Sequence, residues 1–285
     1  MEGLSEHTRL LNITIGLSLR IPNWPGPLKE LGYSPEVIEA NMPEANPDLI
    51  LTNKKYNHSL IVDCKSRTIE EKQTKKYVEI RNDPQILIRR GVVNVPVIRH
   101  YSACPVYISF HDLTKEKQIV ENKIHFLHVV EENNELQIIE SKTEQFQRAD
   151  LNKIFPIDLK GKKPPYALYP FDVEDTQIFK IYILRELFNI ALHQQNSFTE
   201  EELLKNTHKC RDIISEHKKK IFRNIAKRIL HETCKSELRE YLKSDENKWN
   251  IKLQRESNSI KAFQKRCEDA IKSLDDKLKQ KQLLI

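Results

Sequence analysis

Two acidic residues and a lysine stand where short apolar stretches begin and end. Asp48 opens one apolar run, and the next apolar run closes with Asp63-Cys64-Lys65. Because side chains alternate between the two faces of a strand, Asp63 and Lys65 are predicted to point to one side and Cys64 to the other, into the core. The spacing therefore predicts a hairpin-like pair of strands with polar groups gathered at one end.

This combination of residues suits a divalent cation bound beside a phosphate. Mg²⁺ and Mn²⁺ prefer oxygen ligands, which the carboxylates of Asp48 and Asp63 and the backbone carbonyl of Cys64 can supply. The ammonium group of Lys65 beside such an ion can position or activate the attacking water and offset negative charge at phosphorus. We therefore predict Asp48, Asp63 and Cys64 as metal ligands and Asp48, Asp63 and Lys65 as catalytic residues.

The same residues resemble the signature of the PD-(D/E)XK, or restriction-endonuclease-like, nuclease superfamily. Pro47-Asp48 followed by Asp63-Cys64-Lys65 looks like its motif. The run from Leu60 to Arg67 is similar to the corresponding strand of archaeal Holliday-junction resolvases and restriction enzymes. The resemblance covers roughly residues 1 to 110. It implies a mixed β-sheet core flanked by helices and phosphodiester hydrolysis that depends on Mg²⁺ or Mn²⁺.

A second motif follows on the predicted helix after the lysine. Gln73 and Tyr77 match the Q-x-x-x-Y motif of RecB-like members of the superfamily. The resemblance implies that Gln73 is also catalytic, orienting Lys65 or the scissile phosphate, while Tyr77 packs behind it. The plainer alternative is a surface helix rich in Glu and Lys.

The resemblance leaves one metal ligand open. The superfamily usually adds an acid, or in RecB-like members a histidine, from an N-terminal helix, and Gly3 to His7 has a G-x-x-x-H spacing. Five residues compete for this role: Glu6, His7, Glu36, Glu39 and Glu44. The simplest alternative to the whole site is a polar residue at a strand start, Asp48, with a solvated pair, Asp63 and Lys65, at a strand end. The remaining histidines show no metal spacing and no triad partner, so a triad hydrolase is not indicated.

The elements that must position these residues can be read from the apolar pattern. A charged stretch from Ile69 to Arg90, helical in its first part, separates the second predicted strand from the third, which gives the order strand, strand, helix, strand. This order predicts an α/β fold with a mixed sheet flanked by helices. The predicted strands are Asp48 to Thr52, Ser59 to Cys64, Asn94 to Ile98, Pro105 to Phe110, His125 to Val130 and Leu136 to Glu140.

A stretch rich in Pro, Gly and Lys, from Lys160 to Pro170, separates the part of the sequence with predicted strands from a part with helical spacing of its apolar residues. We predict a nuclease-like domain over residues 1–155, a linker over 156–175 and an all-helical basic domain over 176–285. The expected helices begin with Gln177 to Leu192, continue after a cap at Ser197 or Thr199, and end with a packing seam in Ile251 to Ile285. That seam also suits a homodimer or a partner subunit.

Positive charge is concentrated in the last third of the chain. From Glu201 onward there are 22 Lys and Arg residues against 14 Asp and Glu, whereas the first 200 residues contain 25 against 27. Such an asymmetry favours a polyanionic partner for this part, although a lysine-rich solvated helix surface has the same composition. The predicted phosphate-contacting residues are Lys218, Lys219, Lys220, Arg223, Lys227 and Arg228.

The five cysteines are scattered and never form a C-x-x-C pair, which argues against a zinc cluster or a disulfide framework. No run approaches the ~18 apolar residues of a membrane-spanning helix, so we expect a soluble, cytoplasmic protein with no membrane partner. DNA is the expected substrate, chosen by resemblance alone, and RNA stays open. Restriction, anti-phage defence and repair all fit. The alternative is a catalytically inactive nucleic-acid-binding or assembly subunit with a nuclease-like fold.

Overall fold

The computed structural model describes residues 3–95, 100–132, 135–140, 146, 148–245, 248–253 and 257–282. The chain forms two compact units. The sheet unit comprises Glu6–Leu168 with Asp212–Ser215, and the helical unit comprises Met1–Ser5, Tyr169–Arg211 and Glu216–Ile285. The break between Leu168 and Tyr169 lies inside the stretch rich in Pro and Lys.

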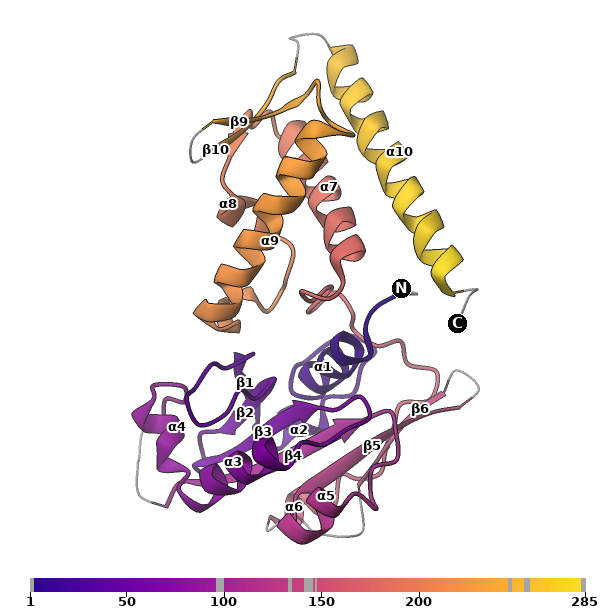
Figure 1. The fold of residues 1–285 in the computed structure, drawn as a ribbon. Helices are drawn as coiled ribbons and strands as arrows, with labels where there is room; N and C mark the ends of the chain where they lie inside the picture. The colour runs from indigo at the N-terminus through magenta and orange to yellow at the C-terminus, as the bar shows by residue number, and fades with distance from the viewer. Residues whose placement is uncertain are drawn as a thin grey trace. The chain divides into compact units, whose positions relative to one another are not determined.

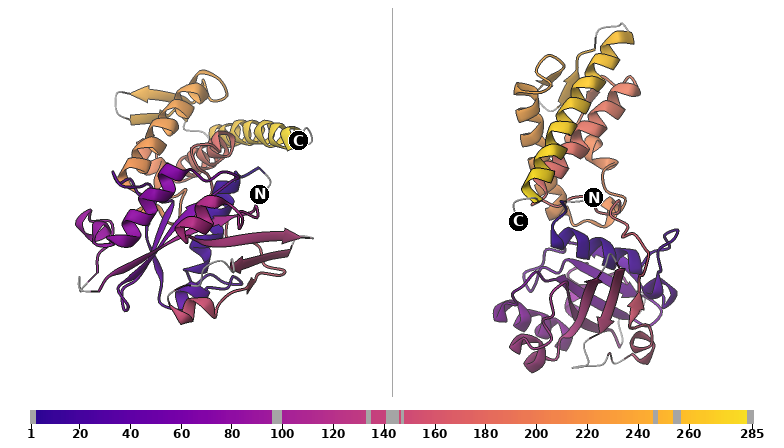
Figure 2. Two further views of the ribbon diagram at one scale, coloured as in Figure 1. Left: turned by 60° about the horizontal axis from the view of Figure 1, so that its bottom comes forward. Right: turned by 90° about the vertical axis from the view of Figure 1, so that its right-hand side faces the viewer.

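The sheet unit is a mixed α/β fold built on a curled sheet of seven strands (Figures 1 and 2). Its strands follow one another across the sheet in chain order, from β1 to β7. The elements are α1 (Glu6–Leu17), α2 (Pro27–Glu30), β1 (Ser34–Ile38), β2 (Leu49–Asn53), β3 (His58–Cys64), α3 (Glu71–Asn82), α4 (Gln85–Arg89), β4 (Ser102–Ser109), α5 (Lys117–Asn122), β5 (His125–Glu132), β6 (Glu135–Glu140), α6 (Ala149–Asn152) and β7 (Ile157–Asp158).

The direction of the strands changes across the sheet. β1, β2 and β3 form an antiparallel meander, β3, β4 and β5 are parallel, and β6 and β7 continue antiparallel. Parallel neighbours need a crossover, which α3 with α4 provides after β3 and α5 provides after β4. As a result, the carboxyl ends of β3 and β4 meet at one edge of the sheet.

Helices cover both faces of the central strands (Figure 1). On one face, Tyr77 and Ile80 of α3 share a core with Ile61 of β3, Tyr107 of β4 and Phe126 of β5. On the other face lies α1, which is buried along almost its whole length and contacts β3. Every residue of β2 and β3 is buried, and this explains why both strands stand out as apolar runs.

The predicted order of elements around the motif residues is confirmed. The strands expected from Asp48, Ser59, Pro105, His125 and Leu136 correspond to β2, β3, β4, β5 and β6. Of the strand expected from Asn94 to Ile98, residues 96–98 lie outside the described residues. β1 was not expected, because Ser-Pro-Glu opens it and only its last residue is fully buried.

The helical unit contains α7 (Thr176–Leu192), α8 (Glu200–Lys205), α9 (Glu216–Lys235) and α10 (Ser257–Gln282). Thr199 caps α8 in a capping box with Glu202, as expected. The seam of α10, with Phe263, Cys267 and Leu274 buried, packs against α7 of the same chain.

The prediction of an all-helical C-terminal domain is wrong in one respect. A three-stranded antiparallel sheet forms in the order β8 (Ser197–Phe198), β10 (Lys248–Ile251) and β9 (Leu242–Asp245). Alternation in β10 buries Trp249 and Ile251, and the Trp249 indole donates a hydrogen bond to Glu200. These strands are two to four residues long, too short to give a clear pattern in the sequence. Among the described residues, no helix is long and apolar enough to cross a membrane.

Candidate active site at the carboxyl end of β3

The antiparallel pairing of β2 and β3 brings the predicted acids together. Leu49, the first residue of β2, pairs with Val62, so Asp48 lies beside the end of β3. The Cys64 backbone N–H donates a hydrogen bond of 2.6 Å to Oδ2 of Asp48. Asp48 and Asp63 therefore meet at one end of neighbouring strands.

Asp63 and Lys65 face the α3 side of the sheet. Nζ of Lys65 lies 2.7 Å from Oδ2 of Asp63 and donates a hydrogen bond of 2.5 Å to Oε1 of Gln73. Both charged residues are buried, with 4% of Asp63 and 7% of Lys65 exposed. Gln73 reaches them because α3 begins at Glu71, close behind the strand in the chain. The structure thus brings together Asp48, Asp63, Lys65 and Gln73.

Aromatic side chains support the lysine from behind. The ammonium of Lys65 lies 5.0 Å from the ring centre of Tyr107, whose residue is the parallel neighbour of Asp63 in the sheet. Tyr77 packs edge-on against Tyr107 at 5.9 Å and is fully buried, one turn beyond Gln73. Tyr107 was not among the predicted site residues, since only the register between β3 and β4 reveals it.

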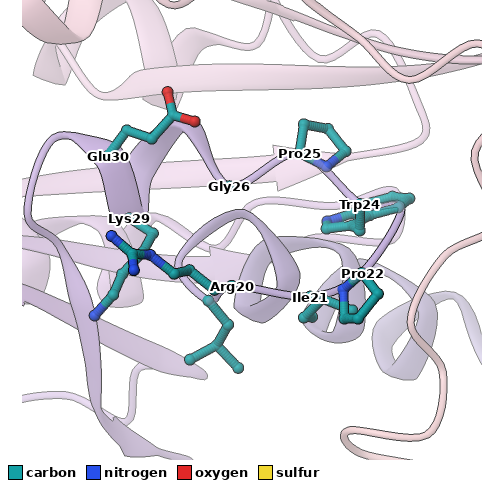
Figure 3. A pocket seen from close by; sticks show the side chains of 9 residues that line it. Arg20, Ile21, Pro22, Trp24, Pro25, Gly26, Lys29 and Glu30 are labelled. Carbon is teal, nitrogen blue, oxygen red and sulfur yellow. The ribbon is translucent and has the colours of Figure 1, made fainter.

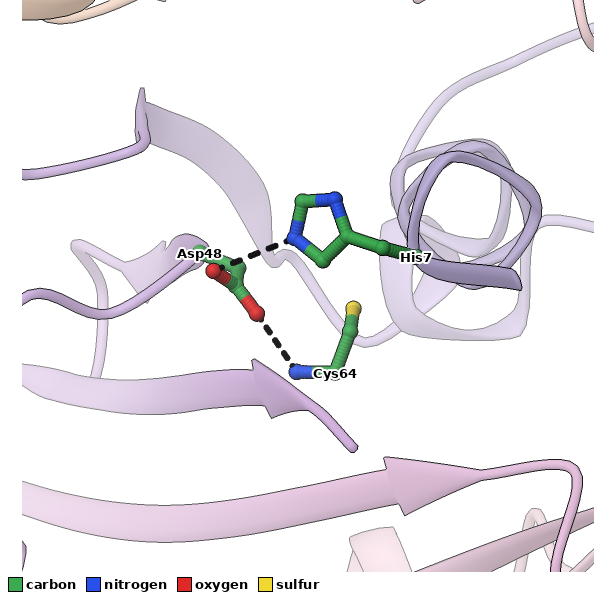
Figure 4. A group of neighbouring side chains, drawn as sticks. All are labelled: His7, Asp48 and Cys64. Carbon is green, nitrogen blue, oxygen red and sulfur yellow. Dashed lines mark hydrogen bonds and ion pairs between the residues drawn. The ribbon is translucent and has the colours of Figure 1, made fainter. Parts of the chain in front are cut away.

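The opposite face of β3 adds a second group of ligand atoms (Figure 4). Nε2 of His7, in the first turn of α1, lies 3.2 Å from Oδ1 of Asp48 and 3.6 Å from Oε1 of Glu39. The thiol of Cys64 points toward this imidazole, and ligand atoms of His7, Asp48 and Cys64 all lie within 4.8 Å of one another. The expected alternation holds, but the buried Cys64 thiol faces polar partners and not an apolar core.

The backbone at Glu39 is held in an unusual conformation. Its φ angle is 55°, in the left-handed region that non-glycine residues rarely adopt. The Glu39 N–H donates a hydrogen bond of 2.8 Å to the backbone oxygen of Asp48. This contact fixes the segment after β1 against Asp48 and turns the Glu39 carboxylate toward His7.

The other three candidates for the additional ligand have partners elsewhere. Glu6 lies 3.3 Å from His111, Glu36 lies 3.2 Å from Lys54, and Glu44 pairs with Arg90. Of the five competing residues, His7 and Glu39 are thus the two that the structure places beside Asp48.

Burial and mutual repulsion separate the acidities of the two aspartates. Burial, followed by the negative charge of Asp48, raises the pKa of Asp63 to about 8 despite the nearby Lys65. Burial also opposes ionisation of Asp48, but the charge and hydrogen bond of His7 and the N–H of Cys64 outweigh it and lower the pKa of that carboxyl. Burial, then the charges of both aspartates, raises the pKa of the Cys64 thiol. Two buried carboxyl groups this close repel each other when both are ionised. A divalent cation bound between them would remove that repulsion.

The donor set fits Mg²⁺ or Mn²⁺. Carboxylate oxygens of Asp48 and Asp63 are ligands that both ions accept, and the imidazole of His7 favours Mn²⁺ over Mg²⁺. The Cys64 thiol is a poor match for a hard cation. We therefore assign Cys64 a role through its backbone, whose N–H already orients Asp48.

The predicted phosphate-contacting residues of α9 fall into two groups. Lys220, Arg223, Lys227 and Arg228 are exposed, and Arg223 lies 3.6 Å from Glu201. Lys218 is buried, with Nζ 2.7 Å from Asp172 and over the ring of Phe222, so it is withdrawn from the predicted surface. Lys219 is half-buried and pairs with Glu216 at 2.8 Å.

A separate hollow in the sheet unit contains no predicted site residue. A pocket of about 480 Å³ is formed by the segment from Leu19 to Glu30, with Arg20 and Lys29 on one side and the apolar Pro22, Trp24 and Pro25 on the other (Figure 3).

Comparison with known proteins places the chain in a family. Residues 6–169 match the MJECL32 domain model, and the chain belongs to the MJECL32 domain family. Residues 172–284 match a domain of unknown function, DUF8601. The chain is 32% identical over 216 residues to a protein of Methanocaldococcus jannaschii described as uncharacterized protein MJECL32. This match covers 66% of the chain and 47% of the relative, so the chain spans about half the length of that protein. No solved structure matches the chain.

Proposed function

We propose that the sheet unit is a nuclease of the PD-(D/E)XK kind that hydrolyses phosphodiester bonds in DNA with Mg²⁺ or Mn²⁺. The observation that carries the proposal is the meeting of Asp48, Asp63 and Lys65 at the carboxyl end of β3. A solvated strand end would leave these side chains exposed and apart. Instead, Asp63 and Lys65 are buried in contact with each other, with Gln73 hydrogen-bonded to the lysine.

His7, Asp48 and Asp63 would hold the metal ion. A bound Mg²⁺ or Mn²⁺ would supply Lewis-acid stabilisation of the charge that develops on the phosphate oxygens. The three side chains come from α1, the start of β2 and the end of β3, and two of them already contact each other. The contact between His7 and Asp48 thus exists before any ion binds, which limits the entropy lost when these two ligands bind the ion.

Lys65 is the residue that would act on the reacting groups. Its ammonium is held by Asp63, Gln73 and the Tyr107 ring, so it can orient a water or offset charge at phosphorus without reorganising first. Because a lysine only donates hydrogen bonds, the Gln73 oxygen must face it. The amide nitrogen of Gln73 then points away from Lys65 and can donate to a phosphate oxygen.

The exposed basic residues of α9 would bind the nucleic-acid backbone. Lys220, Arg223 and Lys227 recur at three- and four-residue spacing, which aligns them on one helix face. Contacts of this kind neutralise phosphates without reading sequence. DNA is proposed on the resemblance to DNA nucleases, and restriction, anti-phage defence and repair are the roles that suit such an enzyme.

A cleavage assay with matched variants tests the proposal. The full chain is incubated with plasmid DNA, linear DNA and single-stranded RNA, with Mg²⁺ or Mn²⁺ and with EDTA. We expect metal-dependent cutting that Asp63→Asn abolishes and Asp83→Asn preserves, since Asp83 is an exposed acid paired with Arg89 at a distant surface. Equal cutting by the parent and Asp63→Asn would refute the site. Binding of DNA by a parent that never cuts any substrate would favour the catalytically inactive subunit.

A further inference from the structure

A second polar cavity lies in the sheet unit near the amino ends of the parallel strands, away from the carboxyl end that holds Asp63 and Lys65. His58 begins β3, Cys104 lies near the start of β4 and His125 begins β5, and all three line the cavity. Phe146 and Arg148 close it from the segment after β6. Its volume is about 230 Å³.

Among the described residues, the charged side chains that line this cavity are all positive. Arg81, Lys123 and Arg148 line it, and its lining includes no carboxylate among the described residues. Arg148 pairs with Asp150, which faces it from α6. Arg81 donates its hydrogen bonds to two neutral backbone oxygens, those of Asn122 and Lys123, so no acid among the described residues balances its charge.

His125 adds a buried nitrogen that has no hydrogen-bond partner among the described residues. His125 is 6% exposed, and its Nδ1 atom has no hydrogen-bond partner among the described residues. Its ring is fixed by stacking on Phe146, with ring centres 4.1 Å apart and planes 3° from parallel. A buried polar atom without a partner is costly, and a bound ligand that accepts a hydrogen bond would remove that cost.

A plainer interpretation accounts for part of this arrangement. Arg81 and Lys123 lie at the carboxyl ends of α3 and α5, where cations are favoured by the helix dipole. Capping does not explain why both charges line one cavity with a buried imidazole whose Nδ1 has no hydrogen-bond partner in the described part of the chain. It also does not explain Arg148, which reaches the same cavity from another part of the chain.

We propose that this cavity is a binding site for a phosphate group, held by Arg81, Lys123 and the imidazole of His125. The volume is below the ~300–1,000 Å³ of sites for drug-sized ligands, which suits a small anion or the terminal phosphate of a larger molecule. Charge-assisted hydrogen bonds to phosphate are the strong interactions that such a lining offers. The site is independent of the proposed metal centre and does not rest on nuclease activity.

Calorimetric titration of the full chain with inorganic phosphate tests the proposal. EDTA is included so that phosphate cannot bind through a metal ion at Asp48 and Asp63. Lys123→Gln and His125→Phe should each weaken binding by about tenfold or more, because each removes one charge-assisted or buried hydrogen bond, and phenylalanine keeps a ring that can stack on Phe146. Lys117→Gln is the matched control, because this lysine of α5 is 73% exposed and does not line the cavity. Its affinity should equal that of the parent.

Two further measurements locate the bound phosphate and identify the kind of molecule that carries it. The Cε1–H resonance of His125 should shift on phosphate addition in the parent and not in Lys123→Gln at the same concentration. A 5′-phosphorylated tetranucleotide that binds more tightly than its unphosphorylated form would identify a strand end as the source, and tight binding of inorganic phosphate alone would identify a small anion. Absence of binding at millimolar phosphate, or equal affinity in the parent and both cavity variants, would overturn the proposal.

Discussion

Nε2 of His7 lies 3.2 Å from Oδ1 of Asp48, and this contact joins the first turn of α1 to the residue just before β2. This contact distinguishes His7 from Glu6, its neighbour in the chain, whose carboxylate turns instead toward His111. A one-residue step along a helix rotates the side chain by about 100°, which explains why the two side chains contact different partners. In the proposed metal site, the additional ligand beside Asp48 is therefore His7 and not Glu6.

Replacement of His7 should weaken the metal site without unfolding the protein. We expect His7→Ala to raise the Mn²⁺ concentration needed for half-maximal cleavage by about 10- to 100-fold, a loss typical of groups that support a metal. The matched control is His111→Ala, because His111 also pairs with an acid at 3.3 Å and has a similar exposed fraction. Equal metal requirements for the two variants would exclude His7 as a ligand.

The stability of the helical unit should decrease below about pH 6.5, because His208 is buried as a neutral group. Burial is the main reason that the pKa of His208 falls to about 4, and its Nε2 contacts the backbone oxygen of Phe171 at 3.1 Å. The unfolded chain binds a proton below its ordinary pKa, whereas the folded chain does not until about pH 4. The contribution of His208 is therefore complete above pH 6.5 and is lost as the pH falls toward 4.

Urea unfolding at several pH values measures this effect. Each proton taken up on unfolding changes the free energy of unfolding by about 1.4 kcal/mol per pH unit. His208→Gln keeps a donor toward Phe171 but cannot be protonated, so its free energy of unfolding should depend less steeply on pH by about that amount between pH 6 and 4. Parallel curves for the two proteins would show that His208 titrates normally in the folded state.

The residues around β3 were predictable because local rules fix them. Alternation along a buried strand places Asp63 and Lys65 on one face and Cys64 on the other, and a hairpin brings Asp48 alongside. The same rules could not choose among His7 and the four glutamates, since that choice depends on how α1 crosses the sheet. Tyr107 could not be predicted as a site residue for a similar reason, because its position beside Asp63 is set by the parallel register between two distant segments.

In the helical unit, the sequence predicted the long helices but not which of their basic residues are buried. The apolar spacing of α7 and α10 predicted these helices correctly, but the sequence of α9 could not distinguish a basic residue on the surface from one in the interior. Lys218 follows the same local pattern as Lys220, yet only Lys218 meets Asp172, a residue far back in the chain. The small sheet of β8, β9 and β10 was missed because each strand is short and because β8 pairs with β10, which lies far along the chain.

The exposed basic face of α9 should account for much of the salt dependence of DNA binding. Replacing Lys220, Arg223, Lys227 and Arg228 with alanine should reduce the slope of log affinity against log salt by about 3.6, given about 0.9 for each of four phosphate contacts. A control with the same loss of charge replaces four exposed lysines of α10: Lys261, Lys265, Lys272 and Lys277. If the slope of log affinity against log salt falls by the same amount in both quadruple variants, net charge and not the α9 face attracts the DNA.

Lys65 provides the sharpest test of the nuclease proposal. Its ammonium contacts Asp63 and Gln73, so Lys65→Ala removes the charge aimed at the substrate while leaving His7 and Asp48 in place. Loss of one preorganised charge stabiliser costs about 10²- to 10³-fold in rate. Folding should survive, because the pKa of Asp63 is already about 8 in the presence of the lysine and the carboxyl can take up a proton when its partner is gone.

The measurement separates catalysis from folding and from metal binding. Cleavage of plasmid and linear DNA at saturating Mg²⁺ is compared for the parent, Lys65→Ala and the control Lys75→Ala, an exposed lysine of α3 paired with Glu71. Circular dichroism checks the fold, and titration with Mn²⁺ checks that the ion still binds. We expect Lys65→Ala to be folded, to bind Mn²⁺ and to be inactive, while Lys75→Ala matches the parent. A rate for Lys65→Ala within about twofold of the parent, far short of the loss expected for a catalytic group, would mean that the strand ending at Lys65 is structural and that the chain is not a nuclease of this kind.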